Sequence, residues 1–152
     1  MAPAAGYSGT PLPRKLGIKP GHEVAVLGGP ASVAARLTGL PGVPPLRRDL
    51  SGRDPLDVIV CFVTWRADLE EQLAALRGRM APAAGLWVAW PKRVSRVPTD
   101  MTEDVIREIA LPTGLVDNKV CAIDEVWSGL RLVIRRELRP PSVWPAAPPP
   151  MS

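Results

Sequence analysis

Two adjacent glycines near the N-terminus have a spacing that suggests chemistry. The stretch 23–27, apolar from Val24 onward, predicts a buried strand, and the stretch 28–32 leads from it towards a helix. A strand, a glycine loop and a helix open a nucleotide-binding β-α-β unit, whose glycines let the backbone approach a cofactor. Pro30, however, has no N–H to donate, and a serine follows where another glycine would be needed. We therefore favour the interpretation that Gly28 and Gly29 only turn the chain.

An acidic residue about twenty positions beyond such a loop can receive the hydroxyls of a ribose. Asp49 is the candidate at this distance, and it follows Arg47 and Arg48. A surface turn at this point is the alternative, and we prefer it. If a cofactor binds, Gly28 and Gly29 would approach it and Asp49 would hold its ribose.

Several further residues follow the predicted strands directly. In an open parallel sheet, ligands bind beyond the carboxyl ends of the strands. A tryptophan beside basic side chains could stack on a base or clamp an anion there. In the alternative, Trp65 covers the core and the basic side chains are solvated. Besides the two glycines, the residues expected at these ends are Thr64, Trp65, Arg66, Pro91, Lys92 and Arg93.

The cysteines and the histidine predict no metal site and no catalytic triad. The chain has two cysteines and one histidine, without metal-ligand spacing between them. If two strands of the sheet separate Cys61 from Cys121, about 14 Å lies between them at about 4.8 Å per strand, which is too far for a disulfide. We expect both thiols to be buried and inert, and His22 to lie in an exposed turn.

Composition predicts one domain with a substantial core. The chain has 152 residues and a formal net charge of +4. It has no apolar run of membrane-spanning length and no secretory signal, so we expect a cytoplasmic protein without a cofactor or membrane partner. The basic residues stand in pairs, and we do not expect nucleic-acid binding from them. These pairs are Arg47-Arg48, Lys92-Arg93 and Arg135-Arg136.

The N-terminal half predicts alternating strands and helices. Thr10 could cap a short helix that Gly17 ends, before the strand at 23–27. The next helix buries Val33, Ala34 and Leu37 and ends at Gly39 and Pro41. An edge strand at 46–50, next to Pro44-Pro45, precedes the clearest strand, at 57–63. The following helix carries Leu69, Leu73, Leu76 and Met80 on one face.

The C-terminal half is organised around a buried strand at 86–90, which the chain enters by a turn at Gly85 and leaves at Pro91. Residues 100–103 have the spacing of a capping box for a helix that buries Val105, Ile106 and Ile109 and ends at Pro112 and Gly114. Strands at 119–124 and 130–136 are joined by 125–129, which permits only an antiparallel hairpin. We expect disordered tails at 1–9 and 139–152, around a Rossmann-like α/β domain at 10–138.

The order of three parallel β-α units, a helix and a closing hairpin resembles the class I S-adenosylmethionine (SAM)-dependent methyltransferases. The stretch 76–88 also looks like their segment of leucine, basic residue, proline, glycine and strand. The resemblance covers residues 22–136 and implies a mostly parallel three-layer sandwich. Between Asp49 and Asp57 the chain is too short for the further helix and strand of such enzymes. The predicted domain is therefore truncated.

A second resemblance concerns short motifs. They are similar to signatures of an uncharacterised bacterial family, a domain of unknown function, over residues 6–138. This resemblance implies a small Rossmann-like domain and no established activity. The motifs are Tyr7-Ser8-Gly9-Thr10-Pro11-Leu12, Lys15-Leu16-Gly17-Ile18-Lys19, Leu86-Trp87-Val88-Ala89-Trp90-Pro91-Lys92, Thr102-Glu103-Asp104-Val105-Ile106-Arg107 and Trp127-Ser128-Gly129-Leu130.

The sequence leaves three hypotheses for function. The first is a non-catalytic Rossmann-like module that binds a protein partner, a second copy or a small regulatory ligand. The predicted hairpin around Trp127, with Gly129 in its turn, is the expected docking edge. The first alternative is a reduced SAM-dependent methyltransferase. The second alternative is nucleic-acid association through Arg47, Arg48, Lys92, Arg93 and the arginines near the C-terminus.

Overall fold

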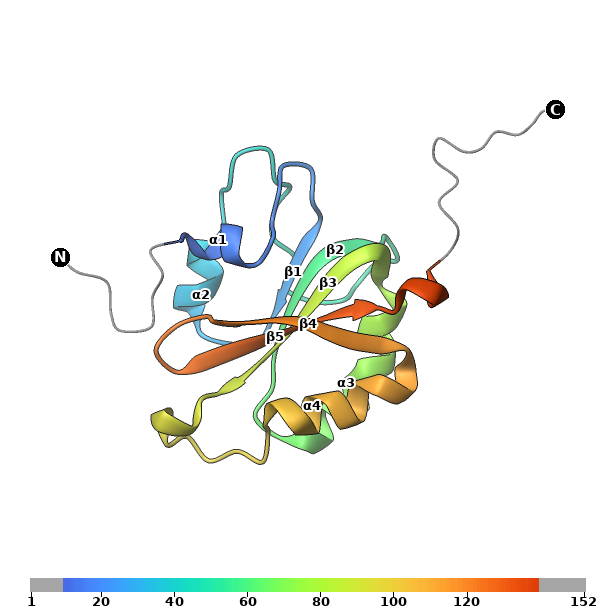
Figure 1. Ribbon diagram of the computed structural model, residues 1–152. Helices are drawn as coiled ribbons and strands as arrows, with labels where there is room; N and C mark the ends of the chain where they lie inside the picture. The colour runs from blue at the N-terminus through green and yellow to red at the C-terminus, as the bar shows by residue number, and fades with distance from the viewer. Residues whose placement is uncertain (1–9, 140–152) are drawn as a thin grey trace.

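A five-stranded mixed sheet forms the centre of the protein, described here for residues 10–139 of a computed structural model (Figure 1). The spatial order of the strands is β1-β2-β3-β5-β4. The first three strands are parallel, and β5 and β4 are antiparallel to their neighbours. The strands are β1 (Val24–Leu27), β2 (Leu56–Phe62), β3 (Met80–Pro91), β4 (Leu115–Ala122) and β5 (Trp127–Ile134).

Helices cover both faces of this sheet, as predicted. Figure 1 shows α1 and α2 on one side and α3 and α4 on the other. The helices are α1 (Leu12–Lys15), α2 (Ala31–Arg36), α3 (Arg66–Gly78) and α4 (Glu103–Ala110), with short 3-10 turns at Arg93–Ser95, Leu111–Thr113 and Arg136–Leu138. The predicted tails at 1–9 and 139–152 lie outside the described residues, apart from Arg139, whose Nε–H donates to the Ile134 oxygen at 2.8 Å.

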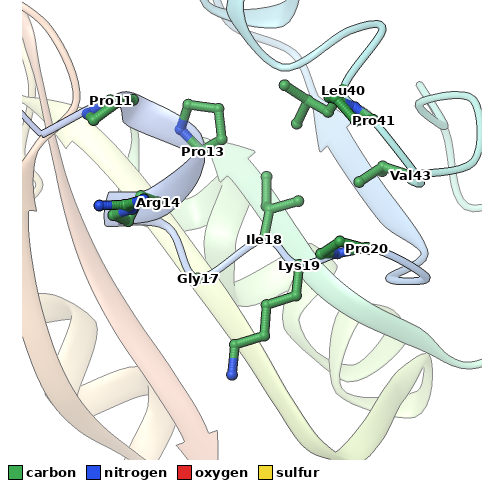
Figure 2. A pocket seen from close by; sticks show the side chains of 10 residues that line it. All are labelled: Pro11, Pro13, Arg14, Gly17, Ile18, Lys19, Pro20, Leu40, Pro41 and Val43. Atoms are coloured by element: carbon green, nitrogen blue, oxygen red, sulfur yellow. The ribbon is translucent and has the colours of Figure 1, made fainter.

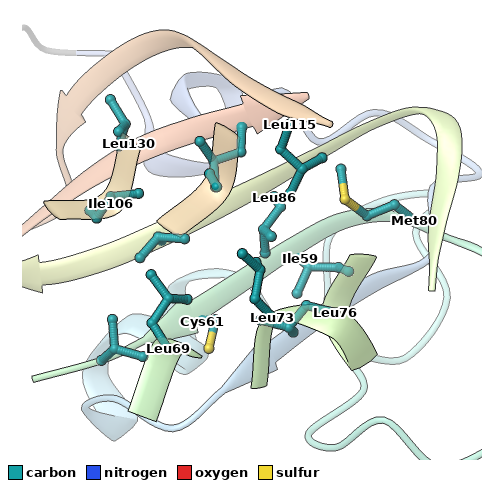
Figure 3. Close-up of a cluster of buried hydrophobic side chains, with 14 of the residues drawn as sticks. Ile59, Cys61, Leu69, Leu73, Leu76, Met80, Leu86, Ile106, Leu115 and Leu130 are labelled. Carbon is teal, nitrogen blue, oxygen red and sulfur yellow. The ribbon is translucent and has the colours of Figure 1, made fainter. Parts of the chain in front are cut away.

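One core cluster lies between the sheet and the helices α3 and α4 (Figure 3). The expected helix face is present, because Leu69, Leu73 and Leu76 are all buried. Ile106 of α4 is also buried, while Val105 and Ile109 are partly buried against the same cluster. The strands contribute Ile59, Cys61, Leu86, Val88, Leu115, Leu130, Leu132 and Ile134.

A second cluster fills the opposite face, under α1 and α2. Its largest member is Trp87 of β3, which is fully buried. The Trp87 Nε1–H donates to the backbone oxygen of Leu16 at 3.0 Å. This bond satisfies the indole and ties the end of α1 to the middle of the sheet. The remaining buried members are Leu12, Leu16, Val24, Val26, Val33, Leu37, Val58, Val60, Ala89 and Ile123.

The prediction of a turn at Gly85 is wrong, because β3 begins at Met80. Met80 therefore belongs to this strand and not to the preceding helix. The pairing with β2 is irregular: from Leu56–Met80 to Val58–Gly85, β2 advances two residues and β3 five. Gly85 itself lies within the strand, and its lack of a side chain leaves room for the Arg131 guanidinium, because a Cβ would lie 2.5 Å from Nε.

The predicted hairpin is present, with shifted bounds. Gly129 lies within β5 and not in the turn, where a Cβ would crowd Ile123 and Trp87. The turn is held by Asp124, whose Oδ1 accepts from the backbone N–H groups of Val126 and Trp127, both at 2.8 Å. Asx-type bonds of this kind stabilise turns without a glycine.

The predicted helix caps also differ. The N-cap position of α1 is Pro11 and not Thr10. Thr102 caps α4, because its Oγ1 accepts from the Val105 N–H at 3.1 Å. Asp100, the expected capping-box residue, instead accepts from the N–H of Arg66 at 2.7 Å and so serves the first turn of α3.

The predicted edge strand at 46–50 is reduced to a single parallel bridge between Arg47 and Ala25. Two backbone bonds of 2.9 Å make this bridge, from Val26 to Arg47 and from Arg47 to Val24. The nearby proline pair shortens the pairing, because proline donates no ladder hydrogen bond.

Both cysteines are free, and β3 and β5 separate the strands that carry them, as predicted. Burial raises the pKa of Cys61 to about 12. The prediction that both are buried is wrong for Cys121, which is half-buried on the edge strand β4. Within residues 10–139, no group of three or more potential metal ligands is found. No helix in this range has the length and apolar character needed to cross a bilayer.

Candidate functional site

The glycine turn lies at the carboxyl end of β1, exposed to solvent. Gly28 and Gly29 have φ angles of +73° and +80°, which glycine adopts without steric cost. Pro30 then occupies the N-cap position of α2 in an extended conformation. The turn is therefore built as the sequence predicts, and both glycines have the conformational role that we favoured.

Gly29 also has a packing role that the sequence did not reveal. The ring of Phe62, the last residue of β2, lies so close that a Cβ on Gly29 would be 2.4 Å from Cδ1. The same ring makes an edge-on contact with Trp127 of β5, with 4.9 Å between centroids and 86° between planes. Phe62 thus links the glycine turn to the hairpin. The one available signal was that the chain's single phenylalanine lies near the end of the clearest predicted strand, at 57–63.

Asp49 follows the segment that bridges β1 on the side away from β2. It follows the bridged Arg47 by two residues, as Leu27 follows the bridged Ala25, so the parallel geometry brings it towards the carboxyl end of β1. Its Oδ1 accepts from the Ser51 N–H at 3.0 Å and from the Ser51 hydroxyl at 2.6 Å. The bond from the Ser51 hydroxyl contributes most to lowering the pKa of Asp49, and the bond from the Ser51 N–H contributes next. The exposed carboxylate is therefore ionised.

Thr64, Trp65 and Arg66 connect β2 to α3. The backbone oxygen of Thr64 accepts from the Thr99 hydroxyl. Trp65 is the N-cap residue of α3, and 47% of it is exposed, so it does not close over the core. Arg66 binds Glu70 at 3.0 Å and Glu108 at 2.9 Å, bonds that raise its pKa. Its guanidinium is thus neutralised by its neighbours.

Lys92 and Arg93 follow β3. The Lys92 N–H donates to the Val126 oxygen at 2.7 Å, which holds this end of β3 against the hairpin turn. A cavity of about 440 Å³ lies beyond the same strand end. It is lined by Trp90, Pro91, Arg93, Arg96, Val97, Pro98, Thr99, Met101, Thr102 and Glu103.

The structure therefore brings only some of the predicted residues together. Phe62 contacts both Gly29 and Trp127, and Trp127 pairs in register with Pro91 beside Lys92. These contacts form a continuous line along the carboxyl edge from β1 to β5.

Two of the arginines proposed for nucleic-acid association, Arg47 and Arg48, already have partners in the protein. Arg47 binds Glu23 at 3.2 Å and Asp54 at 3.5 Å. The Arg48 Nε–H donates to the Val26 oxygen at 3.0 Å. Nucleic-acid binding stays a prediction, with fewer free cations than the sequence suggested.

A further cavity, of about 410 Å³, lies between α1 and the segment 40–43 (Figure 2). Prolines and aliphatic side chains make up most of its wall. The lining residues are Pro11, Pro13, Arg14, Gly17, Ile18, Lys19, Pro20, Leu40, Pro41 and Val43. This apolar hollow lies under the N-terminal helix and away from the glycine turn.

The structure is similar to solved structures of SAM-dependent methyltransferases. Against Aeropyrum pernix fibrillarin, with natively bound S-adenosyl-L-methionine, the TM-score is 0.58 at 13% identity, covering 84% of this chain and 70% of that one. A SAM-dependent methyltransferase from Aquifex aeolicus gives 0.53 at 16% identity, covering 80% and 86%. The ribosomal protein L11 methylase of Lactobacillus delbrueckii subsp. bulgaricus gives 0.54 at 13% identity, covering 82% and 75%.

These similarities define the class of the fold: a Rossmann-like α/β sandwich of the class I methyltransferase type, as the order of elements predicted. At such identities the likeness concerns the fold alone. No protein-family model matches the chain, and no curated protein matches it. The resemblance to the uncharacterised bacterial family therefore stays a prediction.

Proposed function

We propose that this protein binds SAM at the carboxyl edge of its sheet and is a reduced member of the methyltransferase type. The observation that carries the proposal is the exposed Gly28–Gly29 turn at the carboxyl end of β1, with Asp49 two residues beyond the Arg47–Ala25 bridge that runs along the outer side of β1. Similar structures contain the cofactor, among them fibrillarin and a magnesium protoporphyrin IX methyltransferase. These neighbours favour SAM binding over our expectation of a domain without a cofactor.

The residues at this edge are chemically suited to the cofactor. A Cβ on Gly28 would meet only Phe62 atoms at 3.7 and 3.8 Å, so the outer side of Gly28 is open to a ligand. Both described hydrogen bonds to Asp49 end on Oδ1, and Oδ2 could accept from ribose hydroxyls. When bound, SAM supplies a methyl group on a sulfonium. In this proposal Gly28 lets the backbone approach it, and Asp49 orients its ribose.

A non-catalytic module is the second candidate, and the Phe62 contact favours it. The ring covers one side of Gly29, and Pro30 removes an N–H from the loop. Such a domain could keep the sheet and helices while it acts through a partner. The hairpin around Trp127 remains the proposed docking edge for that partner or for a second copy.

Isothermal titration of the full chain with S-adenosylhomocysteine distinguishes the two candidates. We expect saturable binding to the wild type, about tenfold weaker for Asp49→Asn, which keeps the side-chain shape and removes the charge. Glu71→Gln removes an exposed charge from α3 and should leave binding unchanged.

A thermal-shift titration provides an independent readout. A ligand at a hundred times its Kd stabilises the folded state by about 2.7 kcal/mol, which raises the Tm of a domain of this size by several degrees. An unchanged Tm at millimolar S-adenosylhomocysteine or SAM, together with no heat of binding, would exclude the cofactor and leave the non-catalytic module.

A further inference from the structure

A second cleft, of about 390 Å³, lies near the beginning of β1, at the opposite end of this strand from the glycine turn. It is bounded by the connection from α1 to β1, which includes His22, and by the amino-terminal part of β3, which includes Ala83. Strands β4 and β5 complete its wall. The lining residues are Lys15, Leu16, Gly17, Lys19, His22, Ala83, Trp87, Asn118, Lys119 and Arg131.

The cleft concentrates positive charge. Its described lining contains four lysine and arginine side chains and no aspartate or glutamate, which gives a formal charge of +4. The whole chain has 19 basic and 15 acidic residues, so its net charge is also +4. One cavity therefore holds as much positive charge as the net excess of the entire sequence. Such focusing raises the local concentration of anions.

Arg131 of β5 has a different environment from Arg66 of α3 and Arg107 of α4. It is half-buried, and burial lowers its pKa, with a smaller contribution from repulsion by Arg139. Its Nη1–H donates to Asn118 Oδ1 at 3.3 Å, and no carboxylate within residues 10–139 pairs with it. By contrast, Arg66 and Arg107 bind two and three carboxylates. A partly desolvated guanidinium without a carboxylate is stabilised by an anionic ligand.

The structure also holds Arg131 in place. Its guanidinium lies against Gly85, where a Cβ would be 2.5 Å from Nε and 2.9 Å from both Cζ and Nη2. The absence of a side chain at Gly85 therefore lets the Arg131 guanidinium pack directly on the backbone of β3 inside the cleft. Beneath it, Trp87 closes the floor and bonds to Leu16 at 3.0 Å, which fixes the opposite wall.

The opposite wall presents further donors. The Lys15 ammonium donates to the backbone oxygen of Ala122 at 3.2 Å, which holds this lysine between α1 and β4. His22 Nδ1 accepts from the Lys19 N–H at 3.1 Å. A neutral ring with Nδ1 as acceptor carries its proton on Nε2, which is then a donor. Lysine, guanidinium and imidazole donors thus surround one space.

We propose that this cleft binds a small molecule that carries two or more phosphate groups. Two phosphates together carry about three to four negative charges at neutral pH, which matches the four cations. The planar guanidinium suits bidentate contact with phosphate oxygens, and the lysines add point charges. A cleft of a few hundred Å³ has the size of a small-molecule site.

Inorganic pyrophosphate is the probe, titrated calorimetrically into the full chain at low salt. We expect saturable binding that weakens at least tenfold in Arg131→Gln. Because Arg131 is packed against Gly85, the double variant Lys19→Gln/Lys119→Gln, which changes two exposed side chains, should show the same loss with an unchanged Tm. Arg53→Gln removes an exposed charge elsewhere and should bind as the wild type does.

Competing ligands test the chemistry of the proposal. Citrate offers similar charge without phosphate and should bind at least tenfold more weakly than pyrophosphate. Equal binding of citrate, wild-type affinity in all cleft variants, or binding of an RNA oligonucleotide with none of pyrophosphate would overturn it. Asp49→Asn should retain pyrophosphate binding, so this test is independent of SAM binding at the other edge.

Discussion

The ring of Phe62 occupies the space that a side chain on Gly29 would need, at 2.4 Å from an ideal Cβ. Two elements far apart in the sequence, the first strand's turn and the end of β2, therefore constrain each other. Gly29 is required both by its φ of +80° and by this contact.

Gly29→Ala should destabilise the protein by about 2–3 kcal/mol, since overpacking adds to the cost of a left-handed backbone. In a Phe62→Ala background the same change should cost only about 1 kcal/mol, because only the cost of the left-handed backbone conformation remains. Urea unfolding of the four proteins gives the coupling energy. Equal costs in both backgrounds would show that the ring does not restrict residue 29.

The buried indole of Trp87 should contribute a specific hydrogen bond to stability. Trp87→Phe keeps an aromatic ring but leaves the Leu16 carbonyl without this donor, which should cost about 1–3 kcal/mol. Trp65→Phe is the matched control, because Trp65 is 47% exposed and its replacement should change stability by less than about 0.5 kcal/mol. Urea midpoints at constant m-value make the comparison. Similar losses for both variants would contradict the assigned role.

Much of the fold could be predicted because it depends on local patterns. Apolar runs located the strands, and the short 125–129 connection required an antiparallel pair. The misplacements came from contacts across the chain. Glycine is a typical turn residue, but Gly85 lies in a strand, where the Arg131 side chain, 46 positions later, occupies the space that a Cβ would need. Asp100 has local capping-box spacing, yet it binds the first turn of α3.

The two candidate sites also differ in whether local sequence patterns or contacts between distant residues define them. The glycine turn and Asp49 are visible in sequence because a nucleotide-binding unit imposes a fixed spacing on them. The cationic cleft takes its residues from α1, the connection between α1 and β1, and strands β3, β4 and β5, and no spacing along the chain unites them. Its detection required the order β3-β5-β4, which brings Arg131 beside Gly85.

The Cys61 thiol should make stability fall at alkaline pH. Burial raises its folded-state pKa to about 12, above the usual value of 9.0. The thiol therefore stabilises the fold fully below pH 9, and this contribution is lost as the pH rises from 9 towards 12, by up to about 1.4 kcal/mol per unit. Unfolding free energies from pH 8 to 10.5 should fall more steeply for the wild type than for Cys61→Ala.

Cys121→Ala provides the comparison, because burial also raises the pKa of that half-buried thiol. Its removal should flatten the pH dependence less than removal of Cys61. Identical slopes for the wild type and Cys61→Ala would show that the thiol ionises freely in the folded protein.

Asp100 and Thr102 should stabilise different helices although only one residue separates them. Asp100→Ala removes the acceptor for the Arg66 N–H, and Thr102→Ala removes the acceptor for the Val105 N–H. Each loss should cost about 1 kcal/mol, the usual value of an N-terminal cap. Asp100→Asn keeps an oxygen acceptor and should retain most of the stability.

Amide hydrogen exchange separates these roles from the local capping box. Exchange at Arg66 should accelerate in Asp100→Ala, and exchange at Val105 should accelerate in Thr102→Ala, with each opening confined to its own helix. If Asp100 instead capped α4, its replacement would speed exchange in the first turn after Glu103 and leave Arg66 unchanged. Faster exchange at Arg66 with a protected α4 would establish that Asp100 fastens α3 to the segment before α4.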